Sequence, residues 1–432
     1  MALGGGTFVS QNKILPGTYI NFISTSKVDS VLGDRGTVAI PLSLDWGVDD
    51  ELFVLTHADF HSKSKELLGY ELGHEKLKGL RDVFLNAHTV VGYKLTSGGT
   101  KAANEFAIAT HSGVRGNDLK VAISQSVDNS NEFKVVTLLD NQPVDEQIVT
   151  NSNELVANSF VEFKESELSA NAGSALVGGT NGVVDGESHQ VFLDKAESQS
   201  FNALAVVTED ETVNELYAEY TERMRDERGQ KFQAVLFNTP ANYEGVVNVK
   251  NVVAGDNPAG LVYWVAGVVA STAVNASALN TIYNGEFDVD VDYTQTELEQ
   301  AIKAGEFTLH LVGQNVRVLS DINSLVTLED DKGKIFQDNQ TIRIIDQIAN
   351  DIAALFSNKY LGAVPNDQSG RVSLQADIVA HHQALQDIRA IEDFSEGDIT
   401  VEQGIDKKSV IVNDAITIIN TMEKLYMSVI VA

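Results

Sequence analysis

The sequence contains no cysteine. This absence excludes disulfide bonds, thiolate catalysis and zinc sites built on cysteine ligands. Basic residues are also scarce, because 31 Lys and Arg stand against 61 Asp and Glu, which gives a formal net charge of −30. Such an acidic chain is a poor partner for nucleic acid or an anionic membrane surface, and its charge favours solubility at high concentration.

Long apolar segments are missing as well. The longest apolar run, residues 260–270, is too short to cross a bilayer. The first six residues lack the basic and apolar regions of a signal peptide. We therefore expect a cytosolic product without membrane insertion. With 432 residues, of which 43% are hydrophobic, the chain is long enough for two to four domains with separate cores.

Residues that could bind metal give only weak signals. His57 and His61 are four positions apart and could share a zinc ion, but no third ligand and no metalloprotease glutamate accompany them. We expect a solvated loop or the start of a helix there. The alternating segment from Asp288 to Asp292 copies the start of a calcium loop, yet Tyr293 occupies the position that needs glycine. An exposed strand explains this alternation better.

Two further patterns resemble active chemistry without completing it. Residues 178–182 are rich in glycine but lack the lysine of a phosphate-binding loop, so we interpret them as a hinge. His381 and His382 could form an acid–base pair, although a polar helix face with an Asp377–His381 pair is the commoner arrangement. No nucleophile elbow and no serine–histidine–acid group is present. We predict no enzyme activity, no cofactor and no metal.

The domain organisation follows from changes of pattern along the chain. Short strands with turn signals fill the region from about 100 to 178, and glycine clusters bracket it, which is typical of an all-β insertion. We predict an α+β multidomain protein with six parts: an N-terminal extended arm (1–25), an N-terminal α/β part of the core (26–97), an inserted β-sandwich (98–180), a central α/β domain (181–330), a C-terminal α+β domain (331–420) and a C-terminal arm strand (421–432).

The central part alternates strands and helices. Residues 201–207 predict a buried strand, and Thr212 to Glu215 predict a capping box that opens a helix. Gly229 should end this helix before a strand over 232–237, so the two strands should pair in parallel. Beyond residue 331 we expect helices over 340–356 and 374–391, followed by strand pairs.

Both ends of the chain carry isolated strand patterns, over residues 18–23 and 424–431. They are rich in β-branched and aromatic residues, and each would be an exposed edge in a lone monomer. Such a strand can complete the sheet of a neighbouring chain, so we predict assembly rather than catalysis. The expected interface residues are Tyr19, Ile20, Phe22, Ile23, Leu425, Tyr426, Val429 and Val431.

Several motifs in order resemble one family. Residues 4–8 and 15–20 open the series, and residues 113–118 (GVRGND) follow, with Val114 where threonine is common. By the residues alone, this last turn is a hairpin or loop with an exposed arginine. The later motifs are residues 321–327, 360–362 with 370–371, and 422–427. Together they resemble the tail sheath proteins of contractile phages and phage-like bacteriocins, of the defective-prophage type in Gram-positive bacteria.

This resemblance implies a fold and a mechanism. The central domain would have subtilisin-like topology without protease activity. The subunits would form hexameric rings stacked helically around an inner tail tube, with baseplate and tail terminator proteins as further partners. Assembly would occur in the host cytoplasm, and contraction of the virion or phage-like tail would drive the tube through a target envelope. A non-contractile filament or shell subunit is the first alternative, and a hydrolase with a site at the carboxyl ends of the strands is the second.

The charge distribution suggests which part faces the tube. Residues 331–432 hold 9 basic and 15 acidic residues, a net charge of −6, whereas the preceding 330 residues hold 22 and 46, a net charge of −24. The C-terminal domain is therefore the less acidic part. Weak, salt-sensitive pairs with an acidic tube would come from its basic residues. The candidates are Arg343, Lys359, Arg371 and Arg389.

Overall fold

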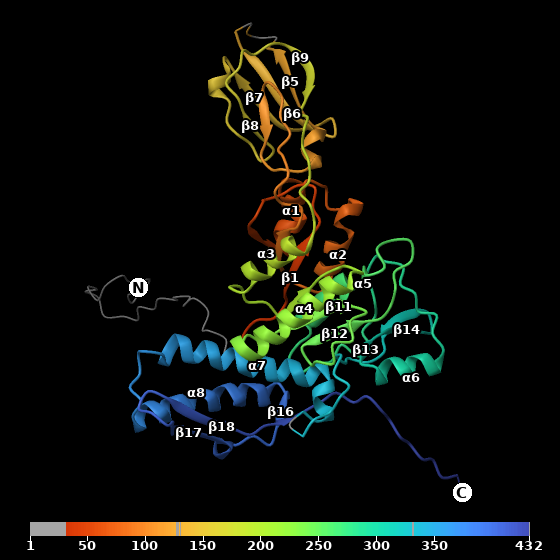
Figure 1. Cartoon of the computed structure of the whole chain (residues 1–432), viewed down its shortest axis with the longest axis vertical. Helices are drawn as coiled ribbons and strands as arrows, with labels where there is room; N and C mark the ends of the chain where they lie inside the picture. Colours follow the sequence, from red (N-terminus) through yellow and green to blue (C-terminus); the bar gives the residue numbers. More distant parts are fainter. Residues whose placement is uncertain (1–31, 127–128, 130, 331, 432) are drawn as a thin grey trace, which may run out of the picture.

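The computed structural model describes residues 32–126, 129, 131–330 and 332–431. Figure 1 shows a β-sandwich at one end, a central α/β body, and a helical domain with small sheets at the other end. The expected multidomain α+β architecture with an inserted sandwich is thereby confirmed. The N-terminal arm, with Tyr19, Ile20, Phe22 and Ile23, lies outside the described residues.

A seven-stranded sheet forms the centre of the molecule, in the order β13-β12-β11-β10-β1-β3-β2. Every neighbouring pair is parallel except β2 with β3. Its inner strands are buried along their whole length, which suits uninterrupted apolar sequences covered on both faces. The strands are β1 (Thr37–Leu42), β2 (Leu52–Thr56), β3 (Thr89–Lys94), β10 (Ala203–Ala205), β11 (Gln233–Phe237), β12 (Val246–Val249) and β13 (Glu306–Phe307).

Helices cover both faces of this sheet. One face packs against α1 (His57–Leu68), α2 (Lys78–Phe84) and α5 (Leu261–Ser271), and the other against α3 (Gly186–Ala196) and α4 (Glu211–Arg223). Alternate residues of β1 separate the two cores, since Val38 and Ile40 belong to the first and Ala39 to the second. The helix α6 (Gln295–Lys303) starts at a Thr294–Glu297 capping box.

The predicted strand–helix–strand unit is confirmed, because β10 and β11 pair in parallel on either side of α4. Gly229 ends the following π turn, Met224–Arg228, in the left-handed region. The predicted capping box is wrong: Asp210 is the N-cap, and its carboxylate accepts the N–H groups of Thr212 and Val213 at 2.9 and 3.3 Å. Because Asp210 is the N-cap, the helix starts at Glu211, one residue before Thr212.

The inserted domain contains a four-stranded antiparallel sheet, β7-β6-β5-β9, and a separate pair, β4–β8. Side chains such as Ile123, Val135 and Phe160 form its own core. Figure 1 shows this domain projecting away from the central sheet. Its strands are β4 (Ala107–Ala109), β5 (Leu119–Gln125), β6 (Phe133–Leu139), β7 (Gln142–Val149), β8 (Val161–Phe163) and β9 (Asn171–Ala175).

Two long helices, α7 (Asn339–Leu355) and α8 (Gln368–Asp387), form the body of the C-terminal domain. They confirm both predicted helices, although α8 begins six residues earlier than expected. Two two-stranded antiparallel sheets belong to this domain, and a third, β14–β15, precedes it in the chain and packs into the core of the central domain. They pair β14 (Leu309–Val312) with β15 (Asn315–Val318), β16 (Ile391–Glu392) with β19 (Thr417–Ile418), and β17 (Ile399–Gln403) with β18 (Val410–Asp414). No helix in the described ranges is both long and apolar enough to span a membrane.

Candidate functional site at the C-terminal arm and the domain junctions

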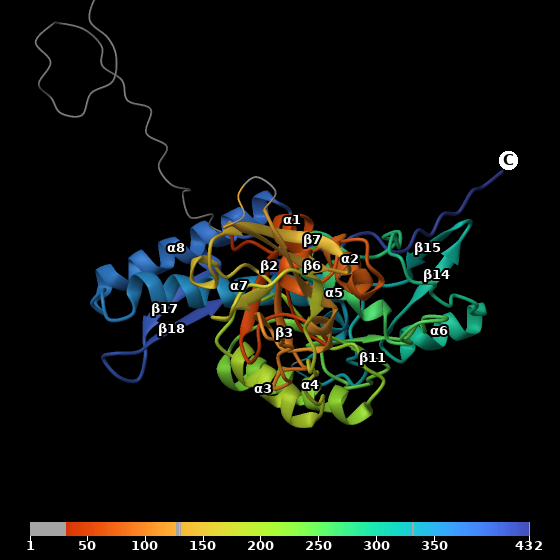
Figure 2. The same ribbon diagram turned by 90° about the horizontal axis from the view of Figure 1, so that it is seen from above.

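The C-terminal arm, residues 421–431, pairs with no strand in the described chain. Figures 1 and 2 both show it running outward from the body. Its large apolar side chains are uncovered, with Leu425 86%, Tyr426 90% and Val431 89% exposed. A contiguous exposed apolar segment is typical of an interaction site, because the contact of apolar side chains with water is unfavourable. The predicted strand is therefore present only as an extended segment that lacks a partner here.

The first turn of α7 fixes the root of this arm. Gln340 is buried, and its side chain accepts the N–H of Thr421 at 3.0 Å and donates to the carbonyl of Ile419 at 3.1 Å. Asn420 Nδ2 donates to Thr341 Oγ1 at 3.2 Å. The position at which the arm leaves the domain is thus set by hydrogen bonds to one helix end.

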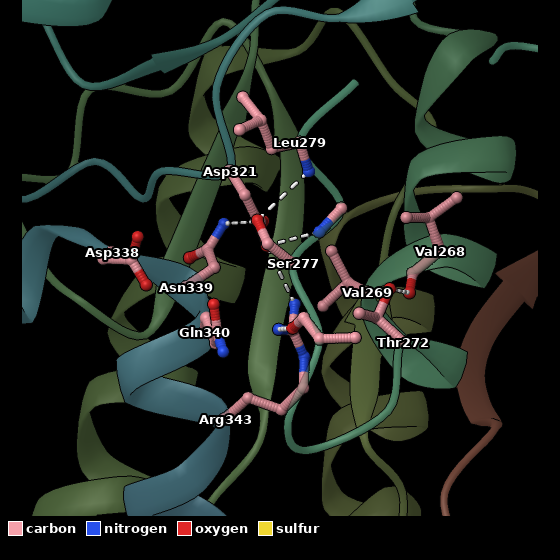
Figure 3. Close-up of polar contacts among 12 residues, drawn as sticks. Val268, Val269, Thr272, Ser277, Leu279, Asp321, Asp338, Asn339, Gln340 and Arg343 are labelled. Carbon is pink, nitrogen blue, oxygen red and sulfur yellow. Dashed lines mark hydrogen bonds and ion pairs between the residues drawn. The ribbon is translucent and has the colours of Figure 1, made fainter. Parts of the chain in front are cut away.

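The same helix turn carries a buried polar cluster around Asp321, shown in Figure 3. The carboxylate of Asp321 accepts from Arg343 Nη2 at 3.3 Å, from Asn339 Nδ2 at 3.0 Å and from the N–H of Ala278 at 2.8 Å. Ser277 Oγ lies 3.2 Å from it. These donors satisfy a carboxylate that would otherwise be costly to bury.

Arg343 was one of the four expected tube-facing residues, and the structure overturns this expectation. Its side chain is 0% exposed, because it pairs with Asp321 and donates to the carbonyl of Ala276 at 2.8 Å. Arg343 instead joins α7 to the central domain.

The rest of the 321–327 motif joins the same two domains. Ser324 Oγ donates to the carbonyl of Tyr243 at 2.9 Å, and the N–H of Ser324 donates to the carbonyl of Val246 in β12 at 2.8 Å. Asn323 Nδ2 donates to the carbonyl of Phe336 at 2.8 Å. This motif is therefore a structural connection between the central sheet and the segment that leads into α7.

A second buried ion pair reinforces this junction. Arg225 reaches Asp346 of α7 with two hydrogen bonds of 2.6 and 2.8 Å, and both side chains are almost fully buried. The nearby carboxylate raises the pKa of Arg225, although burial acts in the opposite direction. A planar, two-point contact of this kind fixes orientation as well as distance.

The GVRGND motif connects the sandwich to the central domain. Arg115 was expected to be exposed, but its side chain is 8% exposed and donates from Nε to the carbonyl of Gly69 at 2.8 Å. Its Nη1 reaches Asp118 and Asp140, each at 2.8 Å, and the guanidinium stacks 4.5 Å from the ring of Tyr70. The expectation fails because two acidic groups and an aromatic ring together replace the hydration of the guanidinium.

The glycines at this junction pack chain segments together. A Cβ atom on Gly182 would lie 1.7 Å from the carbonyl oxygen of Ser97, and one on Gly99 would lie 1.9 Å from that of Thr180. Thr100 and Thr180 form an antiparallel bridge beside them. The hinge interpretation of residues 178–182 is therefore wrong at Gly182, where the absence of a side chain permits a close crossing.

Lys94 completes the sandwich junction from the end of β3. Its Nζ is fully buried and lies 2.9 Å from Asp49 Oδ1 and 2.7 Å from the carbonyl of Ser112. Burial lowers the pKa of Lys94, and the charge of Asp49 partly offsets this effect. The sandwich junction is held by the charge pairs of Lys94 and Arg115 and by hydrogen bonds between its two connecting segments.

The other sequence candidates form no complete chemical site. The ring centroids of His57 and His61 lie 4.5 Å apart at the start of α1, with the ring planes tilted by 40°, and the described residues hold no group of three His, Asp or Glu that could bind a metal ion. A cavity of about 230 Å³ lies at the carboxyl ends of β1 and β10 and includes His189. The Nδ1 atom of His189 is 3.0 Å from the hydroxyl of Tyr217, and among the described residues no carboxylate is hydrogen-bonded to this ring.

His381 and His382 are buried, and their partners are not those that the sequence suggested. They contact Asp351 of α7 at 3.0 Å and Asp414 of β18 at 2.9 Å. Asp377, the expected partner on α8, instead contacts Lys359 at 2.5 Å. Spacing along one helix could not reveal these partners, because both come from other elements.

The three remaining tube-facing candidates do not form one patch. Lys359 is exposed in the π turn Phe356–Tyr360, and Arg371 is half-buried in the first turn of α8, where it contacts Asn366 at 3.0 Å. Arg389 is exposed beyond the other end of α8. A helix of 20 residues is about 30 Å long, so Arg389 lies far from the other two.

These features define a multidomain protein with interlocked domains and an uncovered apolar arm. Three family models match consecutive parts of the chain: the phage tail sheath beta-sandwich domain over 97–181, the central domain over 182–324 and the C-terminal domain over 331–432. The chain is 31% identical to the phage-like element PBSX protein XkdK of Bacillus subtilis, over 99% of both chains. It belongs to the phage tail sheath protein family.

Solved structures agree with this assignment. The sheath tail protein of Desulfitobacterium hafniense is 33% identical, with a TM-score of 0.82 over 95% of this chain and 99% of that chain. The helical sheath of the anti-feeding prophage in the contracted state shares the fold, with a TM-score of 0.56 at 13% identity over 96% and 99% of the two chains. The protein is thus a structural component of a phage or phage-like tail.

Proposed function

We propose that this chain is the subunit of a contractile tail sheath. It polymerises as hexameric rings around an inner tail tube, and contraction drives the tube through a target envelope. The observation that carries this proposal is the uncovered apolar arm at residues 421–431. The similarity of the fold of the whole chain to that of a sheath in the contracted state supports the contractile function.

The arm acts by adding a strand to a neighbouring subunit. The sheets β17–β18 and β16–β19 each have two strands, so they present open edges for pairing. About ten backbone hydrogen bonds at ~0.5–1.5 kcal/mol each supply roughly 5–15 kcal/mol. Ordering some eight residues costs about 1–2 kcal/mol each, which nearly cancels this gain. Stable polymers therefore need many arms at once, including the N-terminal arm over residues 1–25.

The body of the subunit transmits the movement without chemistry. The central α/β domain has subtilisin-like topology in this proposal, and its role is mechanical. The ion pairs Arg343–Asp321 and Arg225–Asp346 keep it aligned with the arm-bearing domain. The polymer assembles in the host cytoplasm, and baseplate and tail terminator proteins are its further partners. Lys359, Arg371 and Arg389 remain the candidates for contact with the tube.

Electron microscopy of negatively stained samples tests the proposal. The full chain and a chain ending at residue 420 are each mixed with the inner tube protein. Striated sheaths around the tube are expected only in the sample that contains the full chain. Single subunits in both samples, even at high concentration, would contradict the proposal. Hollow polymers that form without tube protein at low protein concentration would favour the self-sufficient filament instead.

A further inference from the structure

The cavity of about 230 Å³ lies at the carboxyl ends of two neighbouring parallel strands, β1 and β10. The sheet continues from here in opposite directions, with β3 and β2 beyond β1, and β11, β12 and β13 beyond β10. In open parallel sheets, small molecules bind in the crevice at such a switch point. Pockets for drug-sized ligands measure about 300–1,000 Å³, so this cavity suits a smaller molecule.

The residues that line the cavity carry no negative charge. None of the fourteen described lining residues is acidic, although the chain holds 61 Asp and Glu. The charged lining residue is Lys76, whose side chain is 57% exposed and lies 3.1 Å from Asp45, a residue outside the lining. An ammonium group has three N–H donors, so Lys76 can bind a ligand while it keeps its contact with Asp45. The lining is therefore better suited to an anion than to a cation.

His189 supplies a second donor to the lining. Its Nδ1 atom lies 3.0 Å from the hydroxyl of Tyr217, which is fully buried and has no other partner in the described chain. The hydroxyl must therefore donate to Nδ1, since its hydrogen would otherwise be buried without an acceptor. Burial lowers the pKa of His189, so the ring is neutral at pH 7.5. A neutral ring that accepts at Nδ1 carries its hydrogen on Nε2, which no described residue contacts.

Two further lining residues have donors without partners. Asn257 Oδ1 accepts the N–H of Ala259 at 3.0 Å, which leaves the Nδ2 group without an acceptor among the described residues. The hydroxyl of Tyr263 in α5 makes no hydrogen bond to them either. Burial raises the pKa of Tyr263 to about 12, so this hydroxyl keeps its hydrogen. Three uncommitted donors around one cavity favour an occupant with oxygen acceptors.

We propose that the cavity between β1 and β10 binds a small oxyanion, which is a carboxylate or a phosphate group. The donors are Lys76, His189, Asn257 and Tyr263. Leucine and valine side chains make up most of the remaining lining, which suits a ligand with a short aliphatic chain. The site lies within one subunit and goes beyond the proposed sheath function, on which it does not depend.

Isothermal titration calorimetry of the full chain at pH 7.5 tests this site with hexanoate, inorganic phosphate and hexan-1-ol. We expect saturable binding of one anion per chain, and roughly tenfold weaker binding of hexan-1-ol than of hexanoate, because the alcohol lacks the charge. The anion that binds more tightly identifies the source of the oxyanion. If neither anion binds saturably, or if hexanoate and hexan-1-ol bind equally well, the proposal is wrong.

Two variants tie the binding to this cavity. Asn257→Asp replaces the free donor by a negative charge and still accepts the N–H of Ala259, so it should weaken anion binding at least roughly tenfold. Tyr263→Phe removes a hydroxyl that no described residue contacts. It should keep the thermal stability of the protein and weaken anion binding by roughly threefold to tenfold, which covers the case in which Asn257→Asp fails to fold.

The matched control is Tyr293→Phe, because Tyr293 lies outside the lining. This variant should bind the anion like the wild type. Anion binding that is unchanged in Tyr263→Phe, or that falls equally in Tyr263→Phe and Tyr293→Phe, would contradict the proposed site. Since the measurement uses single subunits, failure of sheath assembly would leave its result unchanged.

Discussion

At the scale of single residues, glycines and buried ion pairs fix the domains to each other. Gly182 offers the sharpest test, because an added Cβ would meet the backbone oxygen of Ser97 at 1.7 Å. We expect Gly182→Ala to destabilise the sandwich junction by roughly 1–3 kcal/mol, the usual scale of overpacking. Limited proteolysis of the segments around 97–100 and 178–183, together with the thermal midpoint, measures this effect.

Gly186 provides the matched control for that substitution. It opens α3, and nothing lies within 4 Å of the position that its Cβ would occupy. Gly186→Ala should change stability by less than about 0.5 kcal/mol. If both variants resist protease equally well, the close crossing at Gly182 does not hold the junction.

Asp82 gives the central domain a pH dependence that the sequence does not reveal. Burial raises the pKa of Asp82 from 3.8 to about 6, although it accepts hydrogen bonds from the N–H of Glu286 and the hydroxyl of Tyr283. The folded chain thus binds this proton more tightly than the unfolded chain. The resulting contribution to stability is complete below pH 4 and is lost as the pH rises to about 6.

The substitution Asp82→Asn should therefore stabilise the protein at pH 7.5, by roughly 3 kcal/mol at most, and the gain should shrink at pH 4.5. Urea unfolding midpoints at the two pH values measure it. Asp288→Asn, at an exposed position, should show no such pH-dependent difference. An Asp82→Asn variant that is equally destabilised at both pH values would show that the lost hydrogen bonds outweigh the removed charge.

Sequence patterns located these residues better than they assigned their roles. Arg115 lies within the 113–118 motif and Arg343 within the predicted helix 340–356, but a basic residue is usually exposed, and both were expected at the surface. Their burial depends on Asp140 and Asp321, which approach only after the chain has folded. Pairing of this kind has no signature in local spacing, and the same reason explains the missed partners of His381 and His382.

At the scale of elements, periodicity identified the parts with strong apolar patterns. The strand β11 and the helix α7 were predictable, because burial demands continuous or helically spaced apolar residues. The strand β9 was not, since Asn171–Ala175 consists of small and polar residues. Its place in the sheet comes from pairing with β5, which only the tertiary structure supplies.

The C-terminal arm is the element whose function can be separated from folding. Val429 is 71% exposed, so Val429→Pro should leave the thermal stability of the single subunit unchanged. Proline removes a backbone N–H that an added strand needs, and we expect tube-templated assembly to fall roughly tenfold. Sedimentation of assembled sheath measures this. Val429→Thr keeps the N–H and the β-branched shape and should assemble normally; equal assembly of both variants would contradict strand addition.

At the scale of the whole molecule, a net charge of −30 opposes close packing of identical subunits. Salt shortens the range of this repulsion from about 10 Å at 0.1 M to about 3 Å at 1 M. At high protein concentration, polymerisation without a tube should therefore increase with sodium chloride, as followed by light scattering. A rate that falls with salt would show that attractive charge pairs between subunits dominate over the net repulsion.

Binding to the tube should respond to salt in the opposite direction. The exposed or half-exposed Lys359, Arg371 and Arg389 would pair with acidic groups of the tube, and salt screens such pairs. Reversing all three charges should weaken co-sedimentation with the tube at low salt and abolish the salt dependence of tube binding. The salt dependence of tube-free polymerisation should stay unchanged. Because the three residues lie at both ends of α8, single reversals should have additive effects. A triple variant that binds the tube like the wild type at every salt concentration would place the tube contact elsewhere on the subunit.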